Sequence, residues 1–230
     1  MRINADFTES VVIRPADREW VASPAGGVER CLLDRVSLDG GVGEVARATS
    51  LVRFAPGSAF PSHTHGGGEE YLVLDGTFSD ETGDFPAGTY VRNPIGTAHA
   101  PHTKDGCTIF VKLHQFAECD DAQFDVALAD RLSSAPNVSG AREAALHRTH
   151  GEYVRVIALD AGASLEEGDP GGAELLVLDG ALIVQDGNWP SGTWARRPHG
   201  AMVTARAGPD GALVWIKTGH LADAIVPSVG

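Results

Sequence analysis

Two stretches of the sequence decide how this chain folds: Gly57-Ser-Ala-Phe-Pro-Ser-His63-Thr-His65-Gly-Gly-Gly-Glu69-Glu-Tyr-Leu-Val-Leu-Asp-Gly76, and Gly88-Thr-Tyr-Val-Arg-Asn-Pro-Ile-Gly-Thr-Ala-His99. The first holds two histidines two positions apart and a carboxylate four residues after the second, and the second ends at a further histidine. Three imidazoles and a carboxylate suit a borderline divalent metal such as Fe, Mn, Ni or Zn. The two stretches therefore predict one metal site, formed by His63, His65, Glu69 and His99.

The spacing places this site on strands. His63 and His65 point to the same face of a strand because strand side chains alternate. The run 69–74 favours a second strand and ends at a dipeptide typical of hairpin turns, Asp75-Gly76. The glycines at 66–68 allow a bend that returns Glu69 beside the two histidines. The helical zinc-protease pattern His-Glu-x-x-His is absent from the sequence.

The neighbours of Glu69 leave alternatives open. Glu70 could supply the carboxylate instead, although only one of the two can face inward. Tyr71 shares the inward face with Glu69, so it could line a pocket and donate a hydrogen bond to a metal-bound ligand, or simply pack in the core. The remaining histidines match no motif position and are predicted to be solvated or hydrogen-bonded: His102, His114, His147, His150, His199 and His220.

The pattern Gly-x5-His-x-His-x3-Glu-x6-Gly, followed by Gly-x5-Pro-x-Gly-x2-His, resembles the two signature motifs of the cupin superfamily. Thr103 stands at the last motif position, where Asn is usual. The wider sequence, with the run 47–54, is similar to ChrR-like cupins, which resemble the zinc-binding C-terminal half of an anti-sigma factor. The resemblance covers about residues 25–115. It implies a small antiparallel β-barrel with a metal in its mouth, and Glu69 rather than Glu70 as the carboxylate ligand.

The second half of the sequence repeats the first at an offset of 104 residues. Residues 174–180 align with 70–76, and 189–193 with 85–89. A repeat of this length predicts two similar domains in tandem, hence a bicupin. The metal ligands are not repeated, because the same offset leads to Glu167, Asp169, Ala173 and Val203.

We therefore expect one divalent transition metal per chain (Fe, Zn, Ni or Mn), held in the N-terminal barrel. We expect the second barrel to be metal-free and structural, covering an edge of the first. Binding of a hard cation such as Ca²⁺ by Glu167 and Asp169 is the alternative.

A short helix is expected between the repeats, because apolar residues there fall at helical spacing: Phe124, Leu128 and Leu132. Asp120 or Asp121 would be its N-cap, and residues 133–140 have the composition of a linker. The predicted fold is all-β, with two tandem cupin barrels (double-stranded β-helix, jelly-roll type) and a short linking helix. The predicted domains are the N-terminal metal-binding cupin at 1–119, the helix and linker at 120–140, and the C-terminal cupin without metal ligands at 141–230.

The charge and composition of the sequence limit the kinds of partner and location that we expect. A formal net charge of −13 and a pI near 5.0 argue against binding nucleic acid or an anionic membrane. The N-terminus lacks the apolar core of a signal peptide and no apolar run approaches ~18–20 residues, so we expect a cytoplasmic protein. The three cysteines have no Cys-x-x-Cys spacing, and Cys107 is predicted to be a small buried apolar residue.

Several functions fit such a site. Sequences similar to this one include iron-dependent dioxygenases that cleave small diketone or hydroxyketone substrates, and the resemblance implies an enzyme of this type. The alternatives are redox-neutral metal chemistry, a zinc-binding ChrR-like sensor or ligand-binding module without catalysis, and a structural cupin. Sigma-factor binding is not expected, because no His-x3-Cys-x2-Cys segment precedes residue 57. The expected partner is a small molecule, and the protein is expected to be a monomer or a homodimer.

Overall fold

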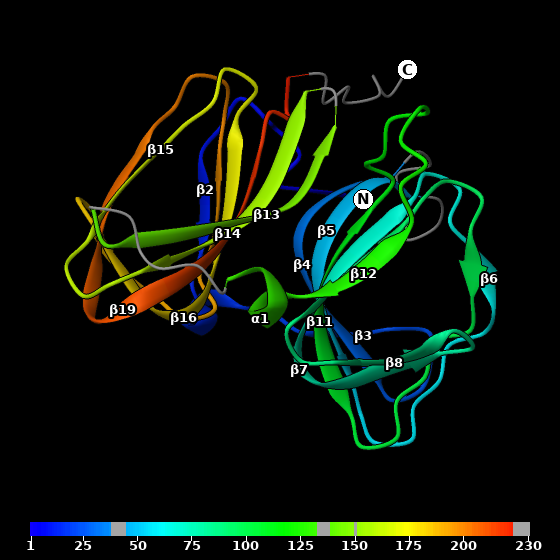
Figure 1. Cartoon of the computed structure of the whole chain (residues 1–230). Helices are drawn as coiled ribbons and strands as arrows, with labels where there is room; N and C mark the ends of the chain where they lie inside the picture. Colours follow the sequence, from blue (N-terminus) through cyan, green and yellow to red (C-terminus); the bar gives the residue numbers. More distant parts are fainter. Residues whose placement is uncertain (38–44, 133–138, 150, 223–230) are drawn as a thin grey trace. The chain divides into compact units, whose positions relative to one another are not determined.

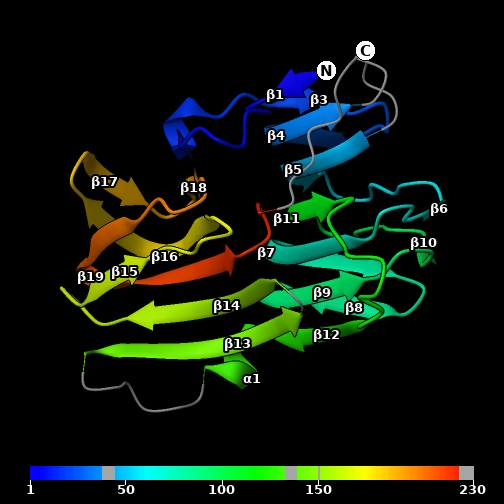
Figure 2. The ribbon, with the colours of Figure 1, turned by 90° about the horizontal axis from the view of Figure 1, so that it is seen from above.

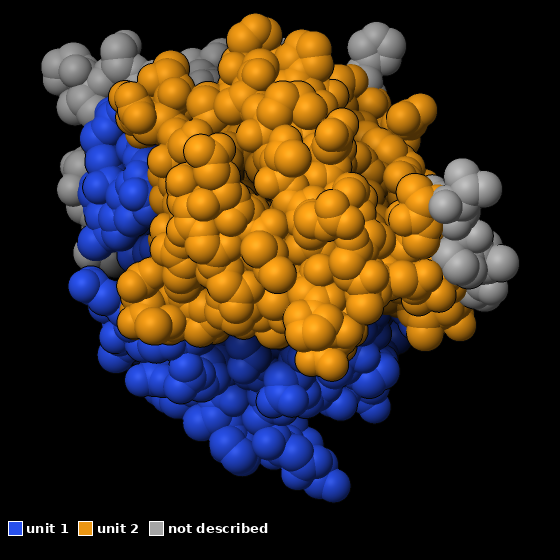
Figure 3. Space-filling view, turned by 90° about the vertical axis from the view of Figure 1, so that its left-hand side faces the viewer, with its two compact units in different colours: residues 1–5, 19–127, 226–230 blue, residues 6–18, 128–225 orange. Residues whose placement is uncertain are grey.

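The computed structural model of the chain describes residues 1–37, 45–132, 139–149 and 151–222. These residues lie almost entirely in strands and the turns between them (Figure 1). They form two compact units, which Figure 3 colours separately. Within the described residues, unit 1 comprises residues 1–5 and 19–127, and unit 2 comprises residues 6–18 and 128–222. None of the helices in this part of the chain is long and apolar enough to cross a membrane.

Unit 1 is built from antiparallel strands. They are β1 (Arg2–Ile3), β3 (Val21–Ala22), β4 (Val28–Ser37), β5 (Val45–Phe54), β6 (His63–Thr64), β7 (Glu69–Asp80), β8 (Gly83–Pro86), β9 (Thr89–Asn93), β10 (Ala98–His99), β11 (Cys107–Leu113) and β12 (Phe124–Ala127). The main sheet has the order β1-β4-β5-β11-β7-β9-β12, with β3 beside β4 and β8 beside β7, while β6 and β10 form a separate pair. Alternate residues of β7 and β11 enter the core, such as Tyr71 with Val73 and Ile109 with Val111. Cys107 is buried in this core, as predicted.

Unit 2 has the same plan. Its elements are β2 (Val11–Ile13), the 3-10 turn η1 (Pro15–Asp17), α1 (Leu128–Arg131), β13 (Ala141–Thr149), β14 (Glu152–Leu159), β15 (Ser164–Glu167), β16 (Ala173–Val184), β17 (Gly187–Pro190), β18 (Trp194–Arg197) and β19 (Val203–Thr218). The sheet order is β13-β14-β19-β16-β18-β2, with β15 beside β19 and β17 beside β16.

The two sheets correspond strand for strand. The order β4-β5-β11-β7-β9-β12 in unit 1 is matched by β13-β14-β19-β16-β18-β2 in unit 2. Figure 2 shows β13, β14 and β19 side by side in unit 2. Strand β19 corresponds to β10 and β11 together, because in unit 2 one continuous strand takes the place of these two separate strands. The prediction of an all-β chain with two tandem barrels is confirmed.

The last strand of the unit 2 sheet comes from a distant part of the sequence. Strand β2 lies before the strands of unit 1, yet it pairs with β18, with Ile13 opposite Trp194. The matching position in unit 1 is taken by β12, which pairs with β9, with Val126 opposite Tyr90. The units therefore differ from the predicted domains 1–119 and 141–230, since residues 6–18 belong to unit 2 and residues 120–127 to unit 1.

The linking helix is shorter than the sequence predicted. Residues 124–127 form β12, and only Leu128–Arg131 is helical. The open edge of β9 offers backbone partners to residues 124–127, and this pairing outweighs the helical spacing of the apolar residues. Asp120 does not cap a helix but pairs with Arg92 of β9. Most of the predicted linker, residues 133–138, lies outside the described residues.

Candidate metal centre

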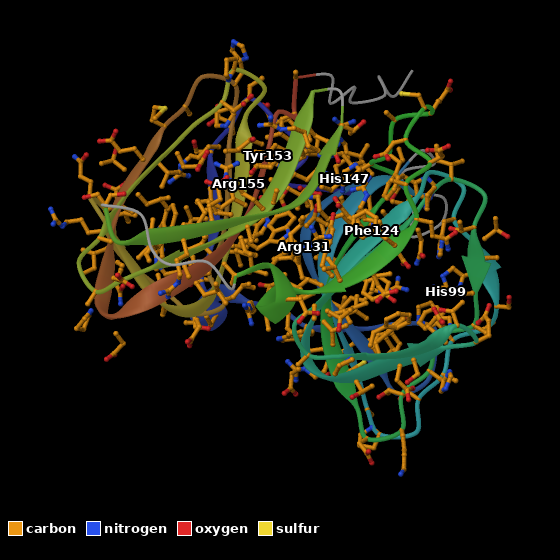
Figure 4. All side chains as sticks on the ribbon, in the orientation of Figure 1. His99, Phe124, Arg131, His147, Tyr153 and Arg155 are labelled. Atoms are coloured by element: carbon orange, nitrogen blue, oxygen red, sulfur yellow. The ribbon has the colours of Figure 1, made fainter. Side chains whose placement is uncertain are left out.

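Three short elements of unit 1 bring the four predicted ligands together. Strand β6 pairs with β10 so that His63 lies directly opposite His99, and Figure 4 shows His99 beside β6. His65 follows β6 and is held by a hydrogen bond from its N–H to the carbonyl oxygen of Thr97, at 2.8 Å. Glu69 is the first residue of β7.

The glycine bend before Glu69 is required by close packing. Gly68 has φ +77°, a left-handed conformation that favours glycine. A Cβ added at Gly67 would lie 2.7 Å from the His114 ring, and one added at Gly68 would lie 2.4 Å from the Phe116 ring. The bend can therefore turn Glu69 back toward the histidines only without side chains at these positions.

The four side chains form a tight cluster. Nε2 of His65 and Nε2 of His99 each lie 3.4 Å from Oε2 of Glu69. The ring centres of His63 lie 5.2 Å from His65 and 5.0 Å from His99. The four potential ligand atoms all lie within 4.8 Å of one another. Ligand bonds of about 2.0–2.2 Å to a central ion fit such separations.

Hydrogen bonds orient the rings. Nδ1 of His63 lies 3.0 Å from the carbonyl oxygen of Pro61, and Nδ1 of His99 lies 3.1 Å from the Asp80 carboxylate. Nδ1 of His65 lies 2.9 Å from the Thr97 hydroxyl, which donates its own proton to a backbone carbonyl and so must accept here. All three rings thus carry their proton on Nδ1 and turn the Nε2 lone pair toward the cluster, as metal-ligating histidines do.

Three of the potential ligand atoms that face the centre of the cluster are not engaged in hydrogen bonds with the described residues. Nε2 of His65, Nε2 of His99 and Oε2 of Glu69 are buried and have no hydrogen-bond partner among the residues that the structure describes. Buried polar atoms are seldom left in this state, and three that converge on one point fit a metal ion between them. The residues present therefore fit the group that the sequence predicted.

Burial also sets the protonation of the cluster. Loss of solvent, with the neighbouring His99 and His63 rings, lowers the pKa of His65 to about 4. Burial likewise lowers the pKa of His99, against the opposing effect of Asp80. Burial raises the pKa of Glu69 to about 7. His65 and His99 are therefore neutral at pH 7, the form that binds metals.

A cavity of about 210 Å³ opens beside the cluster. This is roughly the liquid volume of seven water molecules, which suits a small molecule. Its walls are largely apolar, and they include Val52, Phe54, Phe60, Phe78, Ile109, Val111 and Leu113. Its polar lining outside the cluster includes Arg30, Arg35, Ser50 and His114.

Glu70 and Tyr71, the two residues beside Glu69 whose roles the sequence left open, both have other contacts in the structure. Glu70 lies on the opposite face of β7, where its carboxylate accepts hydrogen bonds from Arg92 at 2.9 Å and from the Tyr90 hydroxyl at 2.5 Å. Tyr71 packs in the core on Phe78, with ring centres 4.8 Å apart, and is not among the residues that line the cavity. Its hydroxyl is buried with no hydrogen-bond partner among the described residues.

Sequence reasoning missed several residues around the site. Arg30 lies 33 positions before His63, and no local pattern links the two. His114, predicted only to be solvated or hydrogen-bonded, also lines the cavity. Asp80 orients His99, but the predicted strand ended at residue 74, so no sequence pattern pointed to Asp80.

The equivalent positions of unit 2 are arranged differently. Glu167, at the position of His63, accepts a hydrogen bond from Arg155 at 2.5 Å. Asp169 accepts one from the backbone N–H of Gly171 at 2.6 Å. Ala173 and Val203, at the positions of Glu69 and His99, are part of the apolar core. Both carboxylates at the ligand positions therefore have partners within the protein.

Comparison with known proteins agrees with the fold. The family model described as the ChrR cupin-like domain matches two segments, residues 8–117 and 125–222. The first segment begins before β2, which pairs with β18 in the sheet of unit 2. The second segment begins within β12, which pairs with β9 in the sheet of unit 1. No curated protein matches the sequence significantly.

Solved structures with the same fold have low sequence identity to this chain. A proposed dioxygenase from Nostoc punctiforme has a TM-score of 0.74 at 16% identity, over 98% of this chain and 90% of that one. A proposed glyoxylate-induced protein from Pseudomonas aeruginosa has a TM-score of 0.71 at 14% identity, over 94% and 91%. A pirin from Escherichia coli in complex with nickel(II) has a TM-score of 0.67 at 12% identity, over 92% and 99%. At these identities the likeness shows the fold alone.

Proposed function

The chain belongs to the ChrR cupin-like domain family, and from this premise we propose that it is a metal-dependent enzyme of the dioxygenase type. Its substrate would be a small diketone or hydroxyketone. The metal ligands in this proposal are His63, His65, Glu69 and His99, and the ion is Fe(II).

One observation carries the proposal. Three buried ligand atoms without hydrogen-bond partners converge beside a cavity of small-molecule size. A purely structural metal site would be closed by protein on all sides, whereas a catalytic site keeps room for a reactant. Fe(II) held by these four residues would supply Lewis-acid and redox chemistry beside the cavity.

The residues of unit 1 have separate tasks in this proposal. Asp80 and Thr97 hold the rings of His99 and His65 through Nδ1, so their Nε2 atoms stay aimed at the centre. The aromatic and aliphatic walls exclude water, which favours binding the carbon skeleton of a ketone. O₂ is the co-substrate, and both of its oxygen atoms would appear in the products of C–C cleavage.

The test is metal analysis followed by oxygen uptake. Protein loaded with Fe(II) should consume O₂ with a β-diketone or a hydroxyacetophenone, and the substitutions His63→Ala, Glu69→Ala and His99→Ala should each abolish metal binding and turnover. His102→Ala is the matched control, because His102 is exposed and its ring lies outside the cluster. Tight zinc in a closed tetrahedral shell, with no O₂ consumption after Fe(II) loading, would refute the proposal.

A zinc-binding ChrR-like sensor is the second candidate, and the match to the ChrR cupin-like domain supports it. In that function the same four ligands would hold Zn²⁺, and the cavity would take a signal molecule without turnover. Such a protein should release or acquire a protein partner on oxidation or metal removal, which size-exclusion chromatography of the full chain would detect.

A further inference from the structure

The cavity beside the candidate metal centre has an excess of positive charge. Arg30 and Arg35, both on β4, line it together with the metal cluster. Among the described residues that line it, Glu69 is the single carboxylate. A divalent ion held there would add two further positive charges to the two guanidinium groups. A cation removed from water needs a partner, so an anion in the cavity would stabilise Arg30.

Arg30 is the residue on which the inference rests. It is half-buried and forms no ion pair within the described part of the chain. Its guanidinium lies 5.6 Å from the centre of the Phe60 ring, which is itself part of the cavity wall. Burial and the nearby charge of Arg35 lower the pKa of Arg30.

Unit 2 shows how the same positions look when the charge is balanced internally. Arg30 is opposite Val52 on β5, and Glu143 is opposite Ile157 at the matching place on β14. Glu143 lies 3.6 Å from Nε of Arg155, whose Nη2 also binds Glu167. The interior cation of unit 2 therefore has two carboxylates of the protein beside it. Unit 1 has Ser50 at the position of Arg155, and its described residues offer Arg30 no such partner.

From this contrast we infer that the ligand of the cavity carries a carboxylate, which pairs with Arg30 while its dicarbonyl part lies toward the four-residue cluster. The inference rests on the proposed function and narrows the substrate from small diketones in general to oxo acids. A guanidinium group suits this task because its fork of N–H donors matches a carboxylate and keeps its charge at all working pH values.

The test compares two ligands that differ in one charge. The probes are 2,4-dioxopentanoate and its neutral methyl ester, titrated calorimetrically into protein whose metal content has been measured. Wild-type protein should bind the acid about ten- to a hundredfold more tightly than the ester. Arg30→Gln should remove that preference by weakening the acid and leaving the ester within about twofold, while Arg30→Lys should restore part of it.

Arg53→Gln is the matched control, because Arg53 is an exposed arginine of the neighbouring strand and pairs with Glu29. It should leave the preference for the acid unchanged. Equal binding of acid and ester by the wild type, or a preference that survives Arg30→Gln at unchanged metal content, would overturn the inference.

Two outcomes separate this inference from the proposed function. Binding of the acid through Arg30 without any O₂ consumption would support the carboxylate site and refute the dioxygenase. O₂ consumption with the neutral ester, at equal rates in the wild type and Arg30→Gln, would support the dioxygenase and refute the carboxylate site.

Discussion

Units 1 and 2 share one strand order but differ in what lies inside the barrel. In unit 1 the interior holds four potential metal ligands and a cavity. In unit 2 the matching interior is packed with apolar side chains, including Trp189 and Val203, and closed by the Arg155–Glu167 ion pair. A change at a few interior positions thus separates a site from a core, while the scaffold around both stays the same.

Two glycines inside the strands β7 and β16 show what the scaffold itself requires. Gly76 and Gly180 have φ values of +71° and +67°. A Cβ at these positions would lie 2.1 Å from the carbonyl oxygen of Gly106 and 2.2 Å from that of Gly211. Only glycine fits such a close approach, so the Asp-Gly pair appears in both halves although the ligands do not. The prediction of a hairpin turn at Asp75-Gly76 is wrong, because β7 continues through this pair to Asp80 and pairs there with β11.

Both units also contain a row of three buried charged residues on neighbouring strands. In unit 1, Glu70 lies opposite Lys112 on one neighbouring strand and Arg92 on the other. In unit 2, Glu174 has the same neighbours, Lys217 and Arg196. All six side chains are almost fully buried. The repeat in the sequence is therefore carried by the scaffold, not by the site.

Removing one metal ligand should have the largest effect on metal binding, and it tests the difference between the two units directly. His99→Ala should weaken metal binding by more than the roughly 10–100-fold that loss of a ligand's hydrogen-bond partner costs. The matching substitution in unit 2, Val203→Ala, should leave metal content unchanged and lower stability only by the loss of a buried methyl pair. Equilibrium dialysis with metal analysis measures both. Full metal retention by His99→Ala would show that the cluster is not the site.

The ion pair of unit 2 gives the second test. Glu167→Ala leaves the buried Arg155 guanidinium with only the more distant Glu143, at 3.6 Å, so it should lower the free energy of unfolding by about 3 kcal/mol. Replacing both partners by apolar residues, Arg155→Met with Glu167→Leu, should restore most of that loss, because no charge remains buried. Chemical denaturation measures these changes. A Glu167→Ala variant as stable as the wild type would contradict the view that this pair closes the barrel.

The partner of His99 gives a smaller effect. Asp80 accepts the Nδ1 proton of His99 through Oδ2, while its Oδ1 accepts hydrogen bonds from Thr82. Asp80→Asn keeps an acceptor for Thr82 but places an NH₂ group before Nδ1, which favours the wrong tautomer of the ring. Metal affinity should fall about 10–100-fold without loss of the fold. Thr82→Ala, the control, should leave the affinity within about twofold.

Much of this arrangement could be predicted from the sequence, because it depends on local spacing. The His-x-His pair and the glycine bend each need particular residues at fixed distances, and the repeat predicts the second barrel. Strand parity explains why Glu69 and not Glu70 reaches the cluster, but the pattern alone allowed either.

The rest depends on contacts between distant segments. The pairing of β2 with β18 joins residues more than 180 positions apart, and nothing in the short run Val11–Ile13 names its partner. The run 124–127 could have continued a helix, and the free edge of β9 decided otherwise. Arg30 enters the cavity from a strand without a motif, so its role became visible only when the cavity was described.

The pH dependence of metal binding sharpens the comparison at Glu69. Because burial raises the pKa of Glu69 to about 7, a metal ion must displace a proton from this carboxylate below pH 7. Metal affinity should therefore fall about tenfold per pH unit between pH 7 and pH 5, and His65, with a pKa of about 4, should add to the slope only near pH 4. Glu69→Gln should bind the metal more weakly at pH 7.5 but lose that slope, because the amide carries no titrating proton. Dialysis against a metal buffer at several pH values measures it. An affinity that stays constant down to pH 5 in the wild type would mean that Glu69 is already ionised there, and that its isolation among apolar walls costs less than its burial implies.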